Sequence, residues 1–235
     1  MLDPNFLTIL SLGFVLGLRH ALDADHVAAV STVLAERPSW RASTVIGFSW
    51  GVGHTIVLFC VGLVVLWLRL RIADAVATAA EFAVGAMLVF LGGSLGFRLV
   101  RERWHLHRHD HDGDSHVHLH SHAVAPHHLH AHWWQDSIRP LCIGMAHGLA
   151  GSAALLLLVV SSSPTVMDGL LYILVFGAGS ILGMVLIGAV LTVPVLWSIS
   201  IGRHAFLAVQ GMASLGSIAL GCSMMLRIWS GEPPL

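Results

Sequence analysis

The sequence predicts an all-α integral membrane protein with about six transmembrane helices, arranged as two inverted repeats of three helices. The first observation behind this prediction is composition: of 235 residues, 56% are hydrophobic and only 11% are charged. A soluble domain is typically about one quarter charged. A chain this apolar is expected where lipid solvates much of its surface. The net charge of −1 offers no basic surface for nucleic acid.

The second observation is the length of the apolar stretches. About 20 predominantly apolar residues are needed to cross a bilayer as a helix. The N-terminus lacks the basic region and cleavage site of a signal peptide, so we expect it to begin a retained span. The stretches that qualify lie at residues 6–33, 43–68, 76–98, 138–160, 168–195 and 204–228.

The third observation is internal similarity between the two halves. LGLRHAL at 16–22 matches IGMAHGL at 143–149, and SWGVGH at 49–54 matches VFGAGS at 175–180. A third match follows in the same order, between LGGSLGFR at 91–98 and LGCSMMLR at 220–227. Because each half has an odd number of spans, the second half must enter the membrane from the opposite side. This arrangement is common in transporters, whose site lies near the midplane.

The repeats divide the chain into three parts. Residues 1–100 form the first three-helix repeat, residues 101–136 form a long polar loop, and residues 137–235 form the second repeat. With the N-terminus outside, the inside loops carry eight arginines and the outside segments three. Arginine favours the cytoplasmic side. We therefore expect a multi-pass protein of the cell inner membrane with both termini outside and the loop in the cytoplasm.

The segment RHALDADH at residues 19–26 predicts a metal site in the first span. Each charge at the bilayer centre costs about 2.5–3.5 kcal/mol, and a divalent cation would offset Asp23 and Asp25. At about 100° per residue, His20, Asp23 and His26 form one stripe of a helix, whereas Asp25 lies about 140° from His20. Either the helix is distorted here, which we favour, or some of these residues orient the ligands. Polar contacts between helices are the alternative without metal.

Two further histidines are candidates for the same site. His54 lies among glycines in WGVGHT of the second span, where close helix approach could bring it to the first span. His147 is the repeat mate of His20, but Ala150, Ser152 and Ala153 stand where the first half has its carboxylates and second histidine. We expect His147 to line the opposite wall or an exit path. The first half should therefore carry most of the metal binding.

Imidazole ligands suit Ni, Co, Cu and Zn, whereas Mg and Ca prefer oxygen. No cysteine lies near the motif, which argues against a copper(I) site. Arg19 stays protonated and cannot be a ligand, so we expect it to pair with one of the aspartates. The residue types do not separate nickel from cobalt or zinc.

The motif RHALDADH resembles the signature of the nickel/cobalt transporter family: a histidine, four residues, then Asp-His in a membrane helix. WGVGHT and GMAHGLAGSAAL resemble further blocks of that family. The resemblance implies that His20, Asp25 and His26 are essential for metal uptake, with His54 close behind, and Asp23 also fits. Family members with an additional helix before the signature differ from this chain, which begins at the signature helix.

Residues 105–132 hold twelve of the seventeen histidines, with aspartates between them. Such a segment cannot form a packed core, so we expect it to be disordered or ordered by metal. Its irregular spacing indicates weak, exchangeable binding to several ions. A cytosolic buffer, sensor or hand-off segment fits this pattern, and a solvated linker is the alternative.

The function we expect is a permease that takes up Ni²⁺ or Co²⁺ as transported substrate, with no catalytic cofactor. The chain has no Walker A motif, so it should not hydrolyse ATP. Metal efflux, an intramembrane metal-dependent enzyme and a metal-storage protein are the alternatives. The absence of H-E-x-x-H argues against the enzyme. A cytosolic nickel chaperone, or a urease or hydrogenase maturation system, is the kind of partner we expect besides the metal ion and the lipid bilayer.

Overall fold

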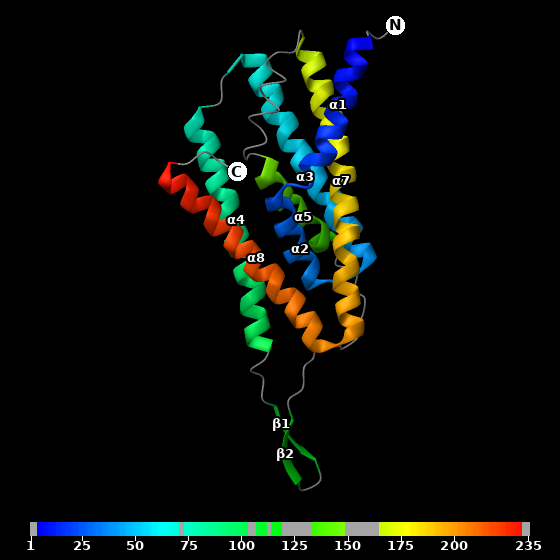
Figure 1. The fold of residues 1–235 in the computed structure, drawn as a ribbon, viewed down its shortest axis with the longest axis vertical. Helices are drawn as coiled ribbons and strands as arrows, with labels where there is room; N and C mark the ends of the chain where they lie inside the picture. The colour runs from blue at the N-terminus through cyan, green and yellow to red at the C-terminus, as the bar shows by residue number, and fades with distance from the viewer. Residues whose placement is uncertain are drawn as a thin grey trace.

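The fold is given by a computed structural model that describes residues 4–70, 73–102, 107–111, 114–118, 133–148 and 165–231. Within these ranges the chain is almost entirely helical (Figure 1). The helices are α1 (Pro4–His20), α2 (Ala24–Glu36), α3 (Trp40–Leu68), α4 (Asp74–Glu102), α5 (Trp133–Gly148), α7 (Val166–Ile201) and α8 (Arg203–Ser230). The strands are β1 (His107–His111) and β2 (Asp114–His118).

The predicted all-helical membrane architecture is confirmed. Four helices of the described part (α3, α4, α7 and α8) are long and apolar enough to cross a membrane. The pair α1 and α2 passes the same test together, although its two helices are bent by 53°, which gives up to five spans. The remaining predicted span, 138–160, begins within α5, and its second part lies outside the described residues.

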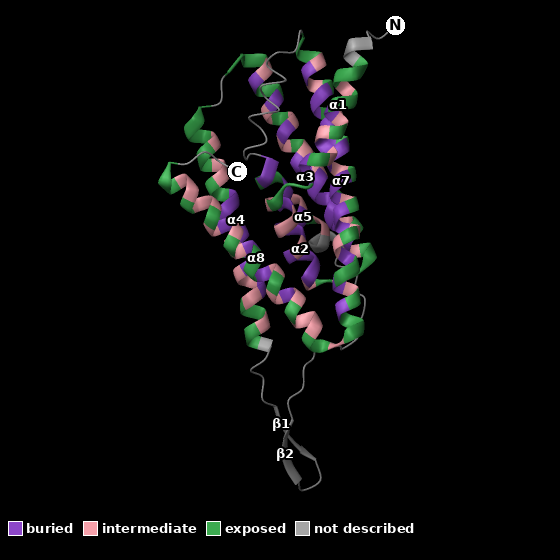
Figure 2. Ribbon diagram, viewed as in Figure 1, coloured by how far each residue is buried: buried purple, intermediate pink, exposed green. Residues whose placement is uncertain are grey.

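The helices pack in pairs, and the contact between α3 and α7 lies at the centre. α3 lies against both α7 and α5, α1 lies against α7, and α4 lies against α8 (Figure 1). The buried residues face the middle of this bundle and the exposed residues face outward (Figure 2). Many exposed side chains are large and apolar, such as Phe90, Val190 and Leu215. An outer surface of this kind is expected of a protein solvated by lipid.

Glycines allow the closest helix contacts, and these contacts come in matched sets. A Cβ on Gly17 of α1 would collide with the backbone oxygen of Phe176 in α7. A Cβ on Gly144 of α5 would collide with the backbone oxygen of Trp50 in α3. Small residues at helix contacts are typical of membrane proteins, because packing rather than water holds the helices together.

A second set of glycine contacts repeats this pattern one turn away. Gly53 of α3 lies against the backbone of Leu141 in α5, and Gly179 of α7 lies against the backbone of Phe14 in α1. In each set the two partners are the residues that the sequence repeats pair with one another. The contact of α1 with α7 therefore corresponds to the contact of α5 with α3.

Polar side chains of α8 bind backbone oxygens of its neighbours. Gln210 donates to the oxygen of Ala35 in α2 at 2.8 Å. Ser214 donates to the oxygen of Gly92 in α4 at 2.8 Å, and Ser217 donates to that of Leu88 at 2.9 Å. Interhelical hydrogen bonds of this kind stabilise membrane bundles by about 0.6 kcal/mol each.

An ion-pair cluster ties α2 to two later helices. Glu36, at the end of α2, accepts two hydrogen bonds from Arg139 of α5, at 2.6 and 3.3 Å. Arg98 of α4 donates a third, at 3.1 Å. The Glu36 side chain is only 9% exposed, so its charge depends on these two guanidinium groups.

Part of the histidine-rich loop, which was expected to be disordered or ordered by metal, lies in the two strands. β1 and β2 form an antiparallel hairpin, in which His107 pairs with His118 and His109 with His116. An isolated two-stranded hairpin is marginally stable in water. The rest of the loop that was expected to bind metal lies outside the described residues.

Candidate metal centre

The first predicted span is broken where the metal motif lies. α1 ends at His20 and α2 begins at Ala24, with the three residues between them in a turn. The backbone N–H groups of Leu22 and Asp23 close this turn on the oxygens of Arg19 and His20, at 2.8 and 3.0 Å. The predicted distortion of the helix is therefore confirmed, and Asp25 is freed from the position that a regular helix would give it.

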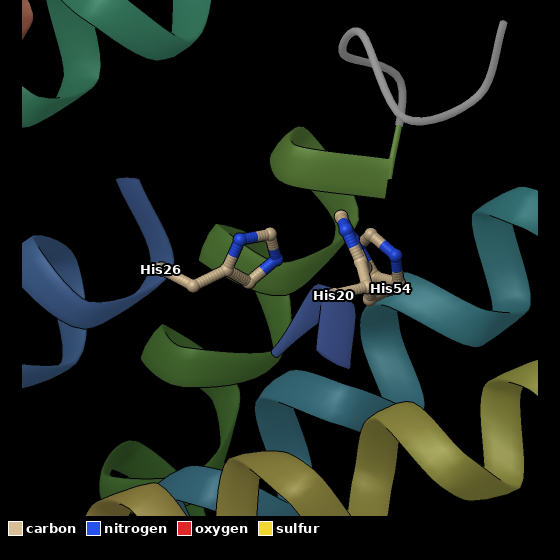
Figure 3. A group of neighbouring side chains, drawn as sticks. All are labelled: His20, His26 and His54. Atoms are coloured by element: carbon tan, nitrogen blue, oxygen red, sulfur yellow. The ribbon is translucent and has the colours of Figure 1, made fainter. Parts of the chain in front are cut away.

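The break brings three histidines together (Figure 3). His20 closes α1, His26 lies in the first turn of α2, and His54 lies in the middle of α3. One nitrogen from each ring lies within 4.8 Å of the others. The rings of His20 and His54 are 5.0 Å apart, and His26 faces them at 4.6 and 5.5 Å. All three side chains are buried, at 8%, 2% and 0% exposure.

The two aspartates bind the histidines beside them. Asp23 Oδ2 lies 2.7 Å from His20 Nδ1. Asp25 Oδ1 lies 3.0 Å from His26 Nδ1 and also accepts the backbone N–H of His26 at 2.9 Å. Asp23, Asp25 and His26 form a second group of ligand atoms within 4.8 Å of one another. Asp23 is 52% exposed and Asp25 is 22% exposed, so the carboxylates lie at the edge of the buried cluster.

His147 reaches the same cluster from α5. Its ring lies between those of His26 and Trp50, with both centroids 4.9 Å away, and it is almost fully buried. Its Nδ1 is 3.2 Å from the backbone oxygen of Ile143, and its Nε2 is 3.8 Å from Asp25 Oδ2. The structure thus brings all six predicted site residues together, although His147 lies outside the three-histidine group.

Several imidazole nitrogens in this cluster are buried without a hydrogen-bond partner among the described residues. They are Nε2 of His20, His26 and His147 and both ring nitrogens of His54. A buried polar atom without a partner costs about 1–3 kcal/mol. A divalent transition metal would satisfy several of these atoms at once, because neutral imidazole nitrogen is a ligand that Ni²⁺, Co²⁺ and Zn²⁺ accept. The donor set therefore fits such an ion.

Two features of the site differ from the sequence interpretation. Arg19 was expected to pair with an aspartate, but it is exposed and forms no ion pair within the described part of the chain. Trp50 was not predicted, yet it is fully buried beside His26 and His147. Its spacing of one helical turn before His54 is the signal that could have identified it.

A groove of about 350 Å³ between α2 and α8 lies next to the break, lined in part by Leu22 and Ala24. Its walls are mostly apolar and contain no imidazole or carboxylate. A divalent ion would find no ligand of either type in it. The buried histidines, rather than this groove, are the candidate metal centre.

Comparison with known proteins identifies the family of the chain. Residues 6–227 match the family model NicO, described as "High-affinity nickel-transport protein". The chain is 37% identical over 212 residues to the urease accessory protein UreH of Bacillus sp. (strain TB-90), covering 89% of this chain and 88% of that protein. It is 33% identical over 89 residues to the nickel transporter NixA of Staphylococcus aureus (strain NCTC 8325 / PS 47), covering 34% of this chain and 26% of NixA.

No solved structure matches the chain. The family model spans nearly the whole sequence, including the broken helix pair, α3 and the second half. Its description concerns transport rather than catalysis, in agreement with the expected permease and against the enzyme alternative. The chain is a multi-pass membrane protein that belongs to the NicO high-affinity nickel-transport family.

Proposed function

We propose that this protein carries Ni²⁺ into the cell by alternating access, with the ion held in the membrane by His20, His26 and His54. The single observation that carries the proposal is the convergence of these three buried rings, one nitrogen of each lying within 4.8 Å of the others. Asp23 and Asp25 supply the negative charge of the site, and His147 lines its opposite wall. Co²⁺ would fit the same donors and is the second candidate substrate.

The position of His54 along α3 supports a site near the membrane midplane. Trp40 and Trp67 lie near the two ends of α3, and both are exposed. Exposed tryptophans are enriched at the two membrane interfaces. His54 lies almost midway between them, about 20 Å along the helix from each at about 1.5 Å per residue. An ion at this depth is distant from water on both sides, as alternating access requires.

The break between α1 and α2 gives the site its entry and its release. A hydrated divalent ion must exchange waters for protein ligands before it can enter a buried cluster. Discontinuous helices are common at transporter sites, because the unwound backbone and the helix ends can meet an ion. We propose that movement of α2 relative to α1 exposes His26 alternately to the two sides.

The matched glycine contacts support the inverted repeat as the framework for this movement. Two repeats related by a two-fold axis would make the contact of α1 with α7 equivalent to that of α5 with α3. The backbone contacts of Gly17 and Gly144 have this relation, as do those of Gly53 and Gly179. We therefore propose residues 1–100 and 137–235 as the two repeats, with the loop of residues 101–136 between them.

The arginine distribution supports a cytoplasmic loop and outside termini, and hence uptake toward the loop. The start of α1 and the end of α4, from which the loop departs, lie at opposite ends of the molecule (Figure 1). An inward divalent ion would gain about 4.6 kcal/mol per 100 mV of membrane potential. The paired positions of His109 and His116 in the hairpin support a loop that receives or buffers the ion.

The name of the relative UreH supports a link to urease maturation, since it describes that protein as a urease accessory protein. We propose that the imported nickel supplies a metalloenzyme of this kind through a cytosolic carrier. Efflux by the same site is the competing function. If the protein were an efflux permease, vesicles would accumulate metal only when the loop faces outward, toward the supplied metal.

The test is uptake of ⁶³Ni²⁺ into proteoliposomes that contain the purified protein. The wild type should accumulate nickel, and His26→Ala should reduce the initial rate to that of empty liposomes. His204→Ala is the matched control, because His204 lies at the start of α8 outside the cluster. Competition with Co²⁺, Zn²⁺ and Mn²⁺ would establish selectivity. Equal accumulation by the wild type and His26→Ala would refute the site.

A further inference from the structure

The buried imidazoles of the centre share one arrangement of their two nitrogens. The Nδ1 atom of His20 lies 2.7 Å from Asp23 Oδ2, and the Nδ1 atom of His26 lies 3.0 Å from Asp25 Oδ1. The Nδ1 atom of His147 lies 3.2 Å from the backbone oxygen of Ile143. In all three rings it is Nε2 that is buried without a hydrogen-bond partner in the part of the chain that the structure describes. Three rings on three different helices therefore have an anchored Nδ1 and an unpartnered Nε2.

This arrangement determines which nitrogen can bind a metal. An ionised carboxylate and a backbone oxygen only accept hydrogen bonds, so Nδ1 must carry the proton that each ring donates. The lone pair of the neutral ring is then on Nε2. A metal-binding histidine commonly donates its other N–H to a carboxylate or a backbone oxygen in this way, which fixes the ring and raises its basicity.

We propose that Asp23 and Asp25 are positioning residues that hold His20 and His26 for the ion, and that neither carboxylate is a ligand. The ion is bound by Nε2 of His20, Nε2 of His26 and one nitrogen of His54. This inference rests on the proposed function and refines it, because it assigns the ligand atoms and gives the carboxylates a separate role.

The alternative is a site made by Asp23, Asp25 and His26, whose ligand atoms also lie close together. The exposed fractions argue against it. Asp23 is 52% exposed while the histidine nitrogens are buried, so a site built on Asp23 would leave the unpartnered nitrogens unsatisfied. It would also compete with the two carboxylate–imidazole hydrogen bonds. The three-histidine site uses only atoms that have no other partner.

The position of the carboxylates also suits transport. Two negative charges one imidazole away from the ion offset its double positive charge, which lowers the cost of bringing it into a low dielectric. Because they are not bonded to the metal, they do not add to the number of bonds that release must break. Keeping the carboxylates out of the ligand set therefore favours release of the ion after transport.

The experiment uses Co²⁺ as the probe, since its visible absorption bands report the type and number of ligands. All variants are made in the full-length chain with the twelve histidines of residues 105–132 changed to asparagine, which removes binding by the loop. Asp23→Asn and Asp25→Asn keep an oxygen that can accept the Nδ1 hydrogen bond, whereas Asp23→Ala and Asp25→Ala remove it. His20→Ala serves as the control that loses a ligand.

We expect the two asparagine variants to keep the band positions of the parent protein and to bind Co²⁺ within about 10-fold of it. The alanine variants should lose about 10- to 100-fold in affinity, as for other orienting partners. His20→Ala should change the bands themselves. If an alanine variant fails to fold, the band positions of the asparagine variants still test the assignment.

Three outcomes would overturn the inference. If Asp23→Asn or Asp25→Asn shifts the bands as His20→Ala does, that carboxylate is a ligand, while the proposed transport function stands. If the alanine variants bind Co²⁺ as tightly as the parent protein, the carboxylates do not position the rings. If His20→Ala leaves the bands of the parent protein unchanged, the proposed site itself fails, and the inference fails with it.

Discussion

The two halves of the molecule share matched glycine contacts and differ in the candidate metal ligands that they carry. Gly17 and Gly144 hold equivalent places against α7 and α3, yet the residues that follow them diverge. The first half continues from His20 into two aspartates and a second histidine. The second half retains His147, but Ala150, Ser152 and Ala153 stand at the corresponding positions. Packing is shared between the halves, whereas the candidate ligands are concentrated in the first.

This difference has a physical reason. Each of these close contacts joins a helix of one half to a helix of the other, so both halves need their glycines. One ion needs only one set of ligands, and every additional charge in the membrane would cost about 2.5–3.5 kcal/mol. A second set of carboxylates would therefore destabilise the protein unless a second ion were bound. The second half can contribute shape and a single neutral imidazole without that cost.

The largest expected effect is on nickel uptake, and it should distinguish His54 from Ser180, the matching residue of the second half. His54→Ala removes a proposed ligand, so the initial rate of ⁶³Ni²⁺ uptake into proteoliposomes should fall about 100-fold or more. Ser180→Ala removes a buried hydroxyl that has no hydrogen-bond partner within the described ranges, and uptake should stay within about 2-fold. Comparable losses in the two variants would mean that the halves share the binding chemistry.

The next largest effect is a loss of stability, which should be equal for the matched glycines of the two halves. Gly17→Ala and Gly144→Ala each place a Cβ against a backbone oxygen that cannot move away easily. Each change should destabilise the protein by about 2–3 kcal/mol, because overpacking a tight contact costs this much. Thermal unfolding in detergent would measure both. Gly211→Ala is the control, since a Cβ there meets nothing within 4 Å. A large effect in only one half would break the proposed equivalence.

A smaller effect is expected at the ion-pair cluster, which joins α2 and α4 of the first half to α5 of the second. Glu36→Gln removes the charge that Arg98 and Arg139 share. Both arginines are partly exposed, so we expect a loss of only about 1–2 kcal/mol in unfolding free energy. The same thermal assay measures it at low and high salt. A loss that is as large as that of Gly17→Ala would show that this cluster, rather than helix packing, dominates stability.

The smallest effect concerns the loop between the halves. Deletion of residues 105–132 should leave the initial rate of uptake within about 2-fold, because none of the proposed ligands lies there. The number of nickel ions bound per chain at equilibrium should fall, since twelve histidines are removed. Loss of uptake on deletion would mean that the loop stores or hands on nickel in a step that transport requires.

The apolar spans could be read from the sequence because lipid demands long apolar helices. The break at the metal motif could be anticipated too, since a regular helix would turn Asp25 away from the histidines. Trp50 could have been singled out by its place one turn before His54, but its ring contact with His147 of α5 and the ion pair of Glu36 with Arg139 could not be anticipated. They depend on how helices distant in sequence pack together, and no local pattern encodes that register. His54 and His147 were identified as candidates, but only the fold brings them to one cluster.

The most direct test of the account compares the repeat mates His20 and His147 by equilibrium dialysis of ⁶³Ni²⁺. Both alanine variants are made in the full-length chain with the loop histidines changed to asparagine, so that only the membrane site binds. We predict that His20→Ala weakens binding at least about 100-fold, whereas His147→Ala weakens it by about 10-fold or less. An equal or greater loss in His147→Ala would contradict the claim that the first half carries the metal site.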